Sequence, residues 1–330
     1  MTRAFWFAVL CALVAPTSAC AAFPGKNGKV AFGSDGIQTI NPDGTERAPV
    51  TLGFDPAWSA DGTRLAFVDT HAPNFETDIF VAEGDGSGRT QVTHEKVCPA
   101  ADACGQVEGP SWSPDGRKIA YSVAVYEGRT YREWTSVIDL TTGQTTKVGD
   151  NLYYPAWSPD GSKMAFSYLG GIAVARPDGT DYTVLTRGLD FHPSWSPDGS
   201  RIAFSRVENY DQLYTMKADG SNQVRLTNEE AHHLDPAWSP DGQKIAFTLV
   251  HLFSNNALFT INADGTGETG LAESAVRPDW QPIPGPRRGD YKNAAQFCKA
   301  EREFFGDEAF RTRYGGGANA YGKCVSANTH

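Results

Sequence analysis

A triplet of an apolar residue, alanine and an aromatic residue recurs along the middle of the chain, each time seven positions after a tryptophan. A Ser-Pro-Asp-Gly turn, or Ser-Ala-Asp-Gly in the first copy, lies between the two, and the tryptophans are Trp58, Trp112, Trp157, Trp195 and Trp238. The alternation of small and bulky side chains predicts a strand, because successive strand residues point to opposite faces. Proline, aspartate and glycine at successive positions predict a tight turn. Each repeat is therefore predicted to begin with two antiparallel strands joined by a hairpin.

The spacing of the repeats predicts how they are arranged. From Trp58 to Trp280 the intervals between tryptophans are 54, 45, 38, 43 and 42 residues, which is the length of one four-stranded propeller blade. A second turn after each triplet predicts a third and a fourth strand. Val30–Phe32 matches a second strand without a tryptophan strand before it, and Trp280 marks a tryptophan strand with nothing after it. We therefore predict an all-β, six-bladed β-propeller of four-stranded blades, closed by its N- and C-terminal strands.

The Trp-Ser-Pro-Asp-Gly-x-x-Ile-Ala-Phe units across residues 29–280 resemble the WD-like repeats of the TolB family. The resemblance implies a six-bladed propeller that binds partner proteins in the periplasm. TolB proteins carry an amino-terminal α/β domain before the propeller, and we expect none here. This chain also extends beyond its repeats at the C-terminal end, so the particular partners of TolB are not carried over to it.

The first 22 residues have the pattern of a secretory signal peptide. Arg3 precedes an apolar run over residues 4–14, and small residues follow, which is the order of a targeting segment. We expect a secreted, periplasmic or cell-envelope protein. Acylation of Cys20, which would make a lipoprotein, is the alternative. No later stretch reaches the roughly 20 apolar residues that a membrane-spanning helix needs.

Three segments are expected: the signal peptide 1–22, the propeller 23–285, and a linker with a small helical module over 286–330. Within the module, residues 293–305 have the apolar spacing of an amphipathic helix, and residues 307–314 suit a second, shorter one. We interpret this module as a stabilising or anchoring appendage.

Four cysteines remain after the signal peptide, and they fall into two local pairs. An oxidising compartment favours disulfides, and no CxxC or HxxxH motif indicates zinc. We therefore predict the bridges Cys98–Cys104 and Cys298–Cys324. The first would hold a flap inserted before Trp112, and the second would stabilise the C-terminal module.

The charge balance narrows the choice of partner. The chain has 29 basic and 39 acidic residues, which is a formal net charge of −10. A broad basic surface is therefore not expected. This argues against nucleic acid or an anionic membrane surface as the main partner.

One face of the propeller is expected to carry the function. The Ser-Pro-Asp-Gly turns and the second turns of the repeats should lie on one side of the ring. The irregular loops, which follow each triplet or precede each tryptophan, should then lie on the other side, where binding residues tend to be found. The residues three before each tryptophan should surround the channel mouth there: Asp55, Gly109, Tyr154, His192, Asp235 and Arg277. All of these except the glycine are predicted binding residues. Neighbours and loop aromatics extend the ring: Glu108, Tyr153, Asp190, His233, Phe75, Tyr126, Tyr131 and Phe253.

The sequence contains neither a Gly-x-Ser-x-Gly elbow, nor a P-loop, nor a His-Glu-x-x-His motif. We therefore predict no catalytic residue, no metal ligand and no cofactor. The expected function is that of a non-enzymatic scaffold that binds an envelope or extracellular protein, or a carbohydrate-like ligand, through its irregular face. The alternative is a propeller enzyme of the lyase, lactonase or glycosidase type with a metal or an acid–base pair in the channel. In that case His192 and His233 could be metal ligands together with Asp55 or Asp235.

Overall fold

The computed structural model divides the chain into two compact units, Met1–Pro282 and Ile283–His330. Each unit has a hydrophobic cluster of its own. The structure describes residues 22–71, 76–94, 103–127, 130–251, 255–286, 291–307, 310–311, 314 and 319–328.

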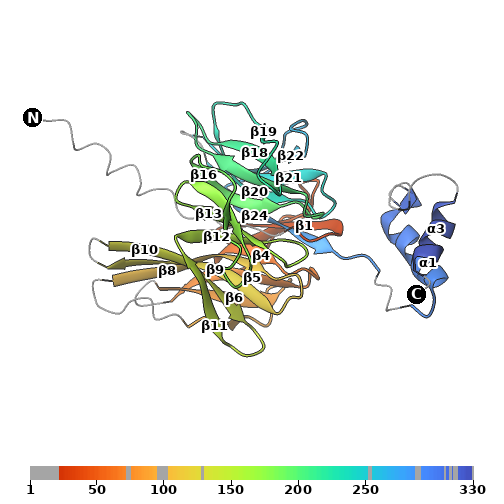
Figure 1. Ribbon diagram of the computed structural model, residues 1–330, viewed down its shortest axis with the longest axis horizontal. Coiled ribbons are helices and arrows are strands. Elements are labelled where there is room, and N and C mark those ends of the chain that lie inside the picture. The colour runs from red at the N-terminus through yellow and green to blue at the C-terminus, as the bar shows by residue number, and fades with distance from the viewer. Residues whose placement is uncertain are drawn as a thin grey trace, which may run out of the picture. The chain divides into compact units, whose positions relative to one another are not determined.

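Six four-stranded antiparallel sheets make up the first unit, as predicted (Figure 1). We number these blades along the chain from Trp58. The first blade is β4 (Phe54–Trp58), β5 (Arg64–His71), β6 (Glu76–Glu83) and β7 (Thr90–Gln91); the second is β8 (Ala103–Trp112), β9 (Lys118–Glu127), β10 (Thr130–Asp139) and β11 (Thr145–Asp150); the third is β12 (Leu152–Trp157), β13 (Met164–Tyr168), β14 (Gly171–Ala175) and β15 (Thr183–Val184); the fourth is β16 (Asp190–Trp195), β17 (Arg201–Arg206), β18 (Gln212–Lys217) and β19 (Val224–Arg225); the fifth is β20 (His232–Trp238), β21 (Lys244–Val250), β22 (Ala257–Asn262) and β23 (Thr269–Glu273); the sixth is β24 (Val276–Ile283), β1 (Lys26–Ser34), β2 (Gly36–Ile40) and β3 (Ala48–Thr51). In Figure 1 the inner strands β4, β12, β20 and β24 lie around the middle of this unit, while β11 and β19 lie at its rim.

The sixth blade is completed by the two ends of the repeat region, which confirms the predicted closure. The last strand, β24, pairs with β1. Gln281 in β24 accepts a hydrogen bond from the Lys29 N–H (3.1 Å), and its amide donates to the carbonyl of Gly62 in the first blade (2.8 Å). Side-chain contacts thus join the closing blade to its neighbour.

The Ser-x-Asp-Gly turns are held by their own side chains. In the fourth blade the Ser196 hydroxyl donates to Asp198 (2.6 Å) and accepts from the Arg201 N–H (2.9 Å). Gly199 closes the turn with a φ of 70°, where a side chain would be strained. The same hydroxyl–carboxylate bond recurs in the other four turns of this type. These carboxylates therefore stabilise the fold locally.

Neighbouring blades are joined at their tryptophans in two ways that alternate around the ring. Where alanine precedes a tryptophan, its carbonyl accepts from the indole N–H of the next blade: Trp112 to Ala57 (3.0 Å), Trp195 to Ala156 (3.1 Å) and Trp280 to Ala237 (3.1 Å). Where serine or aspartate precedes it, that side chain accepts from the backbone N–H of the next tryptophan: Trp157 to Ser111 (3.2 Å), Trp238 to Ser194 (3.2 Å) and Trp58 to Asp279 (2.5 Å).

Residues 22–25 cross the face that carries the Ser-x-Asp-Gly turns. The Gly25 N–H donates to the Pro240 carbonyl (3.1 Å), and Pro24 lies against turns of the third and fourth blades. Phe23 is buried in a cluster that also contains Trp112 and Trp157. The segment that follows the predicted signal peptide is therefore part of the propeller core.

In the second unit a disulfide joins two helices. The first, α1 (Ala294–Phe305), confirms the predicted amphipathic helix and is capped by the Asn293 side chain. The second, α3 (Ala320–Ala327), was not predicted. The predicted Cys298–Cys324 bridge connects them. Neither of these helices is long and apolar enough to cross a membrane, within the part of the chain that the structure describes.

Several predicted features lie outside the described residues. They are most of the signal peptide, the loop aromatics Phe75 and Phe253, the Tyr126 side chain, the Cys98–Cys104 bridge and parts of the helix predicted over 307–314.

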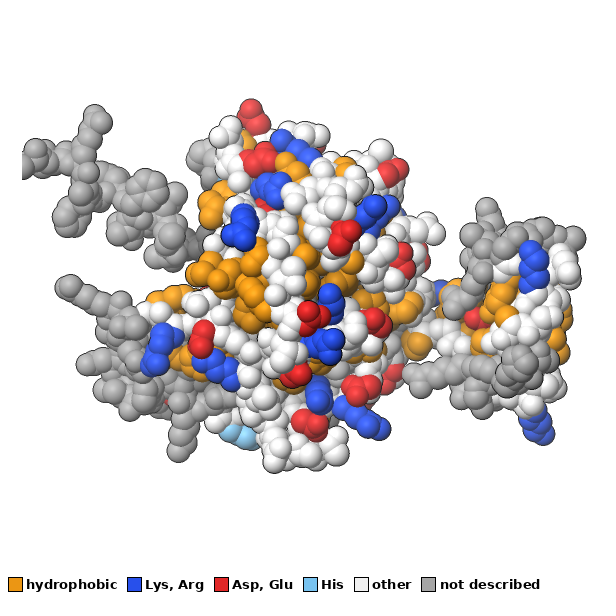
Figure 2. Space-filling view, viewed as in Figure 1, with side chains coloured by type: hydrophobic (Ala, Val, Ile, Leu, Met, Phe, Trp, Pro, Cys, Tyr) orange, Lys and Arg blue, Asp and Glu red, His pale blue; other side chains and the backbone are white. Residues whose placement is uncertain are grey.

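The surface on the side shown in Figure 2 is mixed in character. Hydrophobic side chains gather over the middle of the first unit, and acidic and basic side chains are scattered around them. On that side the described residues form no broad basic area, as expected from the net charge of −10.

Candidate functional site

Every inner strand of the propeller turns through a left-handed residue three positions before its tryptophan. The φ angles lie between 52° and 57° at these six positions: Asp55, Gly109, Tyr154, His192, Asp235 and Arg277. The strand register shifts at this point in all five blades whose pairing is resolved here. In three blades the N–H of this residue donates to a hydroxyl of the preceding blade: Tyr154 to Ser122 (2.7 Å), His192 to Ser167 (3.0 Å) and Arg277 to Thr248 (2.8 Å).

The five predicted binding residues come together, although they belong to five different blades. Arg277 forms an ion pair with Asp55. His192 Nδ1 lies 3.2 Å from Asp235 Oδ1, and the His192 and Tyr154 ring centroids are 4.7 Å apart, edge to face. We call these five residues the channel cluster. All are buried except Tyr154, which is half-buried.

Burial controls the charges of the channel cluster. It raises the pKa of Asp55, although the Arg277 guanidinium opposes the shift. It also disfavours the charged form of Arg277, but the carboxylates of Asp55 and Asp235 outweigh it and raise the pKa of the guanidinium. Burial, assisted by the charge of Arg277, lowers the pKa of His192 well below its usual range. The cluster therefore combines two carboxylates, one guanidinium and a neutral imidazole.

Two further acidic residues lie nearby: Glu108 interacts electrostatically with Asp55 and Arg277 of the cluster, and Glu133 interacts with Glu108. Burial and the neighbouring charge of Asp55 raise the pKa of Glu108 to about 8, so this carboxyl is protonated at neutral pH. Burial raises the pKa of Glu133 to about 7. Glu108 was predicted as a neighbour of the ring, whereas Glu133 was not predicted. Glu133 lies on β10, in the strand next to β9, and no periodic pattern in the sequence marks it.

Two predicted members of the ring have other partners. Asp190 is paired with Arg206 (2.6 Å to Nε) on the neighbouring strand of its own blade. His233 packs on Phe247, with ring centroids 5.4 Å apart. Both residues lie two positions before the left-handed residue of their strand, His192 and Asp235 respectively. Their partners therefore differ from those of the channel cluster, and their place in the channel ring stays a prediction.

Exposed apolar side chains lie on the face that carries the irregular loops, which we call the mouth face. Leu169, in the hairpin between β13 and β14, is 68% exposed, and Leu189, just before β16, is 61% exposed. A Cβ added to Gly170 would lie 3.0 Å from Leu189, so the two loops touch. The Val207 N–H donates to the Leu189 carbonyl (2.8 Å). We call Leu169, Leu189 and Val207 the apolar rim. Tyr131, another predicted aromatic of this side, is also exposed.

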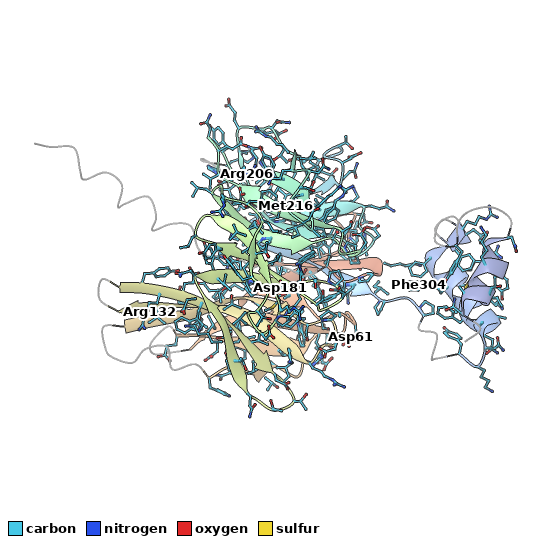
Figure 3. The ribbon with its side chains drawn as sticks, viewed as in Figure 1. Asp61, Arg132, Asp181, Arg206, Met216 and Phe304 are labelled. Atoms are coloured by element: carbon cyan, nitrogen blue, oxygen red, sulfur yellow. A yellow bond between two sulfur atoms is a disulfide. The ribbon has the colours of Figure 1, made fainter. Side chains whose placement is uncertain are left out.

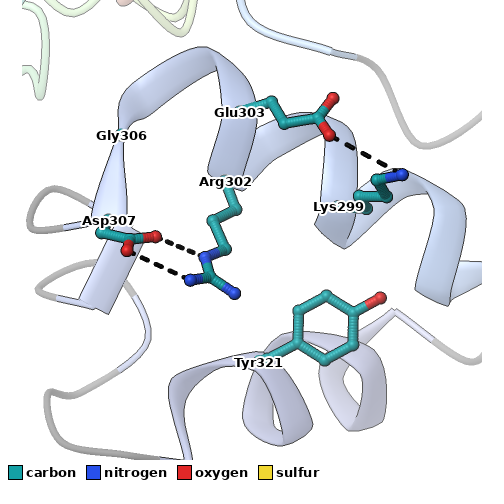
Figure 4. Close-up of a pocket in the computed structure, with 6 residues that line it drawn as sticks. All are labelled: Lys299, Arg302, Glu303, Gly306, Asp307 and Tyr321. Carbon is teal, nitrogen blue, oxygen red and sulfur yellow. Dashed lines mark hydrogen bonds and ion pairs between the residues drawn. The ribbon is translucent and has the colours of Figure 1, made fainter.

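A separate pocket occurs in the second unit (Figure 4). It is lined by Lys299, Arg302, Glu303, Gly306, Asp307 and Tyr321. Lys299 pairs with Glu303 (3.8 Å), and Arg302 pairs with Asp307. Because both cations are already paired with adjacent carboxylates, this pocket has little capacity for a charged ligand.

A closed ring of six four-stranded blades, with inner strands that bring charged residues together at the centre, defines a β-propeller with WD-like repeats. The family model described as the TolB beta propeller domain matches residues 102–282, more than half of the chain. The protein therefore belongs to the TolB beta-propeller domain family.

Solved structures share this fold at low sequence identity. TolB from Acinetobacter baumannii matches with a TM-score of 0.65 and 19% identity, over 79% of this chain and 68% of TolB. A chain of the nidogen/laminin complex matches with a TM-score of 0.61 and 12% identity, over 78% of this chain and 99% of the other. Oligogalacturonate lyase from Vibrio parahaemolyticus matches with a TM-score of 0.52 and 14% identity, over 78% and 79%. No curated protein matches the sequence.

Proposed function

We propose that this protein is an exported, non-enzymatic scaffold whose partner is a protein of the cell envelope or the extracellular space. The partner contacts the apolar rim with apolar side chains and directs a basic or hydrogen-bonding side chain at the channel cluster. The observation that carries the proposal is the exposure of Leu169 and Leu189 on the same face as a buried cluster with two carboxylates and one guanidinium. Exposed apolar patches on an otherwise polar surface are typical of interaction sites.

The matching family and the similar solved structures support a protein partner, although their likeness to this chain is one of fold. The family is named for the TolB propeller, and one similar structure is by its title a complex of two proteins, nidogen and laminin. Rigid propellers present loops of several blades on one face, so a partner can contact side chains that lie far apart in the sequence.

Site-specific crosslinking tests this proposal. A photoreactive amino acid replaces Leu189 on the apolar rim or, as a matched control, Val224, which is 45% exposed on the outer strand β19. Irradiation of the native envelope fraction should give one discrete adduct from position 189 and none from position 224. The adduct should disappear when Leu169→Asp is added. Adducts of equal yield at both positions, or none at position 189, would contradict the proposal.

One observation favours an enzyme as the second candidate. Glu108, with its pKa of about 8, lies beside the Asp55 carboxylate, and acid–base catalysis uses such a pair of carboxyl groups with different protonation. A similar structure is titled oligogalacturonate lyase in complex with manganese. The purified protein is therefore incubated with oligogalacturonate and Mn²⁺, and the ultraviolet absorbance of the unsaturated product is followed. Turnover that Glu108→Gln abolishes would favour the enzyme, and no turnover would remove this candidate.

A further inference from the structure

Outside the channel cluster, two carboxylates and an imidazole converge in the fifth blade. Glu229 lies in the loop before β20, His233 in β20, and Glu268 in the turn before β23. One ligand atom from each of these residues lies within 4.8 Å of the others. Two atoms bound tetrahedrally to one zinc ion are about 3.4 Å apart, so ordinary side-chain rotation brings this set around a single ion. The Glu229 carbonyl is held by the Gln212 amide (2.9 Å), which fixes the loop.

The imidazole of His233 is oriented so that one of its ring nitrogens can bind a metal ion. The side chain is 0% exposed, and its Nδ1 lies 3.0 Å from the Ala231 carbonyl. A carbonyl only accepts hydrogen bonds, so Nδ1 carries the proton and Nε2 presents its lone pair. Nε2 is buried without a hydrogen-bond partner among the described residues. A backbone carbonyl that orients one ring nitrogen in this way is a common feature of metal-binding histidines.

The fourth blade shows what the corresponding positions hold when a cation is part of the chain. Arg206 extends from β17 (Figure 3) and donates to Asp190 (2.6 and 2.8 Å) and to Gln223 (2.9 Å). Its guanidinium thereby bridges the inner strand and the outer turn of the blade. The strand registers of the two blades match, because Phe204 pairs with Tyr214 as Phe247 pairs with Phe259.

In the fifth blade the cation is missing from the same place. His233 stands where the fourth blade has Asp190, Glu268 where it has Gln223, and Leu249 where it has Arg206. Neither Glu229 nor Glu268 forms an ion pair within the described part of the chain. The two carboxylates thus lie close together, and within the described ranges neither is paired with a lysine or an arginine.

We propose that Glu229, Glu268 and His233 Nε2 bind a divalent first-row transition-metal ion, with Zn²⁺ as the preferred ion. A mixed nitrogen and oxygen donor set suits Zn²⁺ better than Ca²⁺, which takes oxygen ligands. The ion would connect the loop before β20 to the outer turn of the fifth blade, as Arg206 does in the fourth. Three protein ligands leave a coordination position for water, and the exposed Glu229 provides access from solvent.

Calorimetric titration with zinc tests the site. The full chain, purified without a histidine tag and freed of metal by a chelator, is titrated with ZnCl₂ and, separately, with MnCl₂ and CaCl₂. We expect one Zn²⁺ per chain, weaker binding of Mn²⁺ and no Ca²⁺ binding at the same concentrations. Glu268→Gln, which copies the residue of the fourth blade, and Glu229→Gln should each weaken zinc binding at least tenfold.

The control is Glu230→Gln, which changes an exposed glutamate next to the set and should leave zinc binding unchanged. Zinc should also raise the Tm of the wild-type chain but not that of the Glu229→Gln/Glu268→Gln variant. The absence of zinc binding in the wild type would overturn the proposal. Binding that all variants retain would overturn it too, because it would place the ion elsewhere, as at the His232–Asp211 pair (2.8 Å).

Discussion

The residues at the centre of the ring adopt a backbone conformation that most of their side chains disfavour. Tyr154 and Arg277 have φ angles of 52° and 57°, in a region that is rare for residues other than glycine, asparagine and aspartate. Gly109 has the same φ without any side chain to place. The conformation is thus a requirement of the inner strand in every blade. The choice of side chain at these positions is then free to serve binding, which is where strained residues tend to gather.

The Arg277–Asp55 pair is expected to be the most sensitive contact of the channel cluster. Arg277→Met leaves the Asp55 carboxylate buried without its partner, which should lower the free energy of unfolding by about 3–5 kcal/mol. The exposed Lys147–Asp150 pair is the matched control, and Lys147→Met should cost less than about 1 kcal/mol. Urea denaturation measures both values. Adding Asp55→Asn to Arg277→Met should recover part of the loss, and equal costs for the two single variants would show that the pair has no special role.

Glu108 is expected to make stability depend on pH. Burial gives this carboxyl a pKa of about 8 in the folded protein, against an ordinary value of 4.5. Between these two values the folded state binds more protons than the unfolded state, so the free energy of unfolding falls as pH rises. Glu108→Gln removes this contribution, and its advantage over the wild type should grow from pH 5 to pH 8. Denaturant midpoints across this range provide the measurement, and parallel curves for both proteins would argue against a buried, protonated Glu108.

At the scale of the strands, the residue before each tryptophan selects how adjacent blades are joined. Alanine leaves its carbonyl accessible to an indole N–H, whereas serine or aspartate binds the backbone N–H of the next strand. In the second case the indole nitrogens of Trp58, Trp157 and Trp238 have no hydrogen-bond partner among the residues described. The two kinds of contact alternate around the ring. Equivalent tryptophans in adjacent blades therefore differ in whether their indole N–H stabilises the fold through a hydrogen bond.

Replacing tryptophan by phenylalanine should therefore have unequal effects in adjacent blades. Trp112→Phe removes an indole that donates to the Ala57 carbonyl, whereas Trp157→Phe removes one without such a bond. Both side chains are buried, so the loss of apolar area is similar. We expect Trp112→Phe to cost about 1 kcal/mol more than Trp157→Phe. Chemical denaturation of the two variants decides the point, and equal destabilisation would mean that the indole bond has no net value.

At the scale of the whole molecule, ring closure depends on a strand that comes from the far end of the repeat region. β24 pairs with β1, so the first and last strands of the propeller hold each other in place. Without β24 the edge of β1 would be unpaired, and unpaired sheet edges promote aggregation. The C-terminal unit has its own cluster around Phe297 and Phe310 and its own disulfide, so it should not be needed for the ring.

Two truncations separate these contributions. A chain that ends at residue 285 keeps β24 and should unfold in one cooperative transition. A chain that ends at residue 275 loses β24, leaves the edge of β1 unpaired, and should aggregate or unfold without cooperativity. Thermal unfolding followed by circular dichroism compares them. If the shorter chain unfolds like the longer one, the two ends do not close the ring in solution.

The sequence by itself determined the number of blades, the closure of the ring, the helix over residues 294–305 and the Cys298–Cys324 bridge. These features depend on local turn residues and on the spacing of residues along the chain. Both can be recognised directly in a repeated sequence. The eight-residue helix α3 escaped prediction because it contains Gly322 and has no clear amphipathic period. Only the tertiary structure decided that Arg277 pairs with Asp55, that Glu133 lies near Glu108, and that His233 lies near Glu229 and Glu268. The physical reason is that such contacts depend on how whole blades are placed around the ring and on the direction of each strand. Neither of these is determined by the sequence of a single segment.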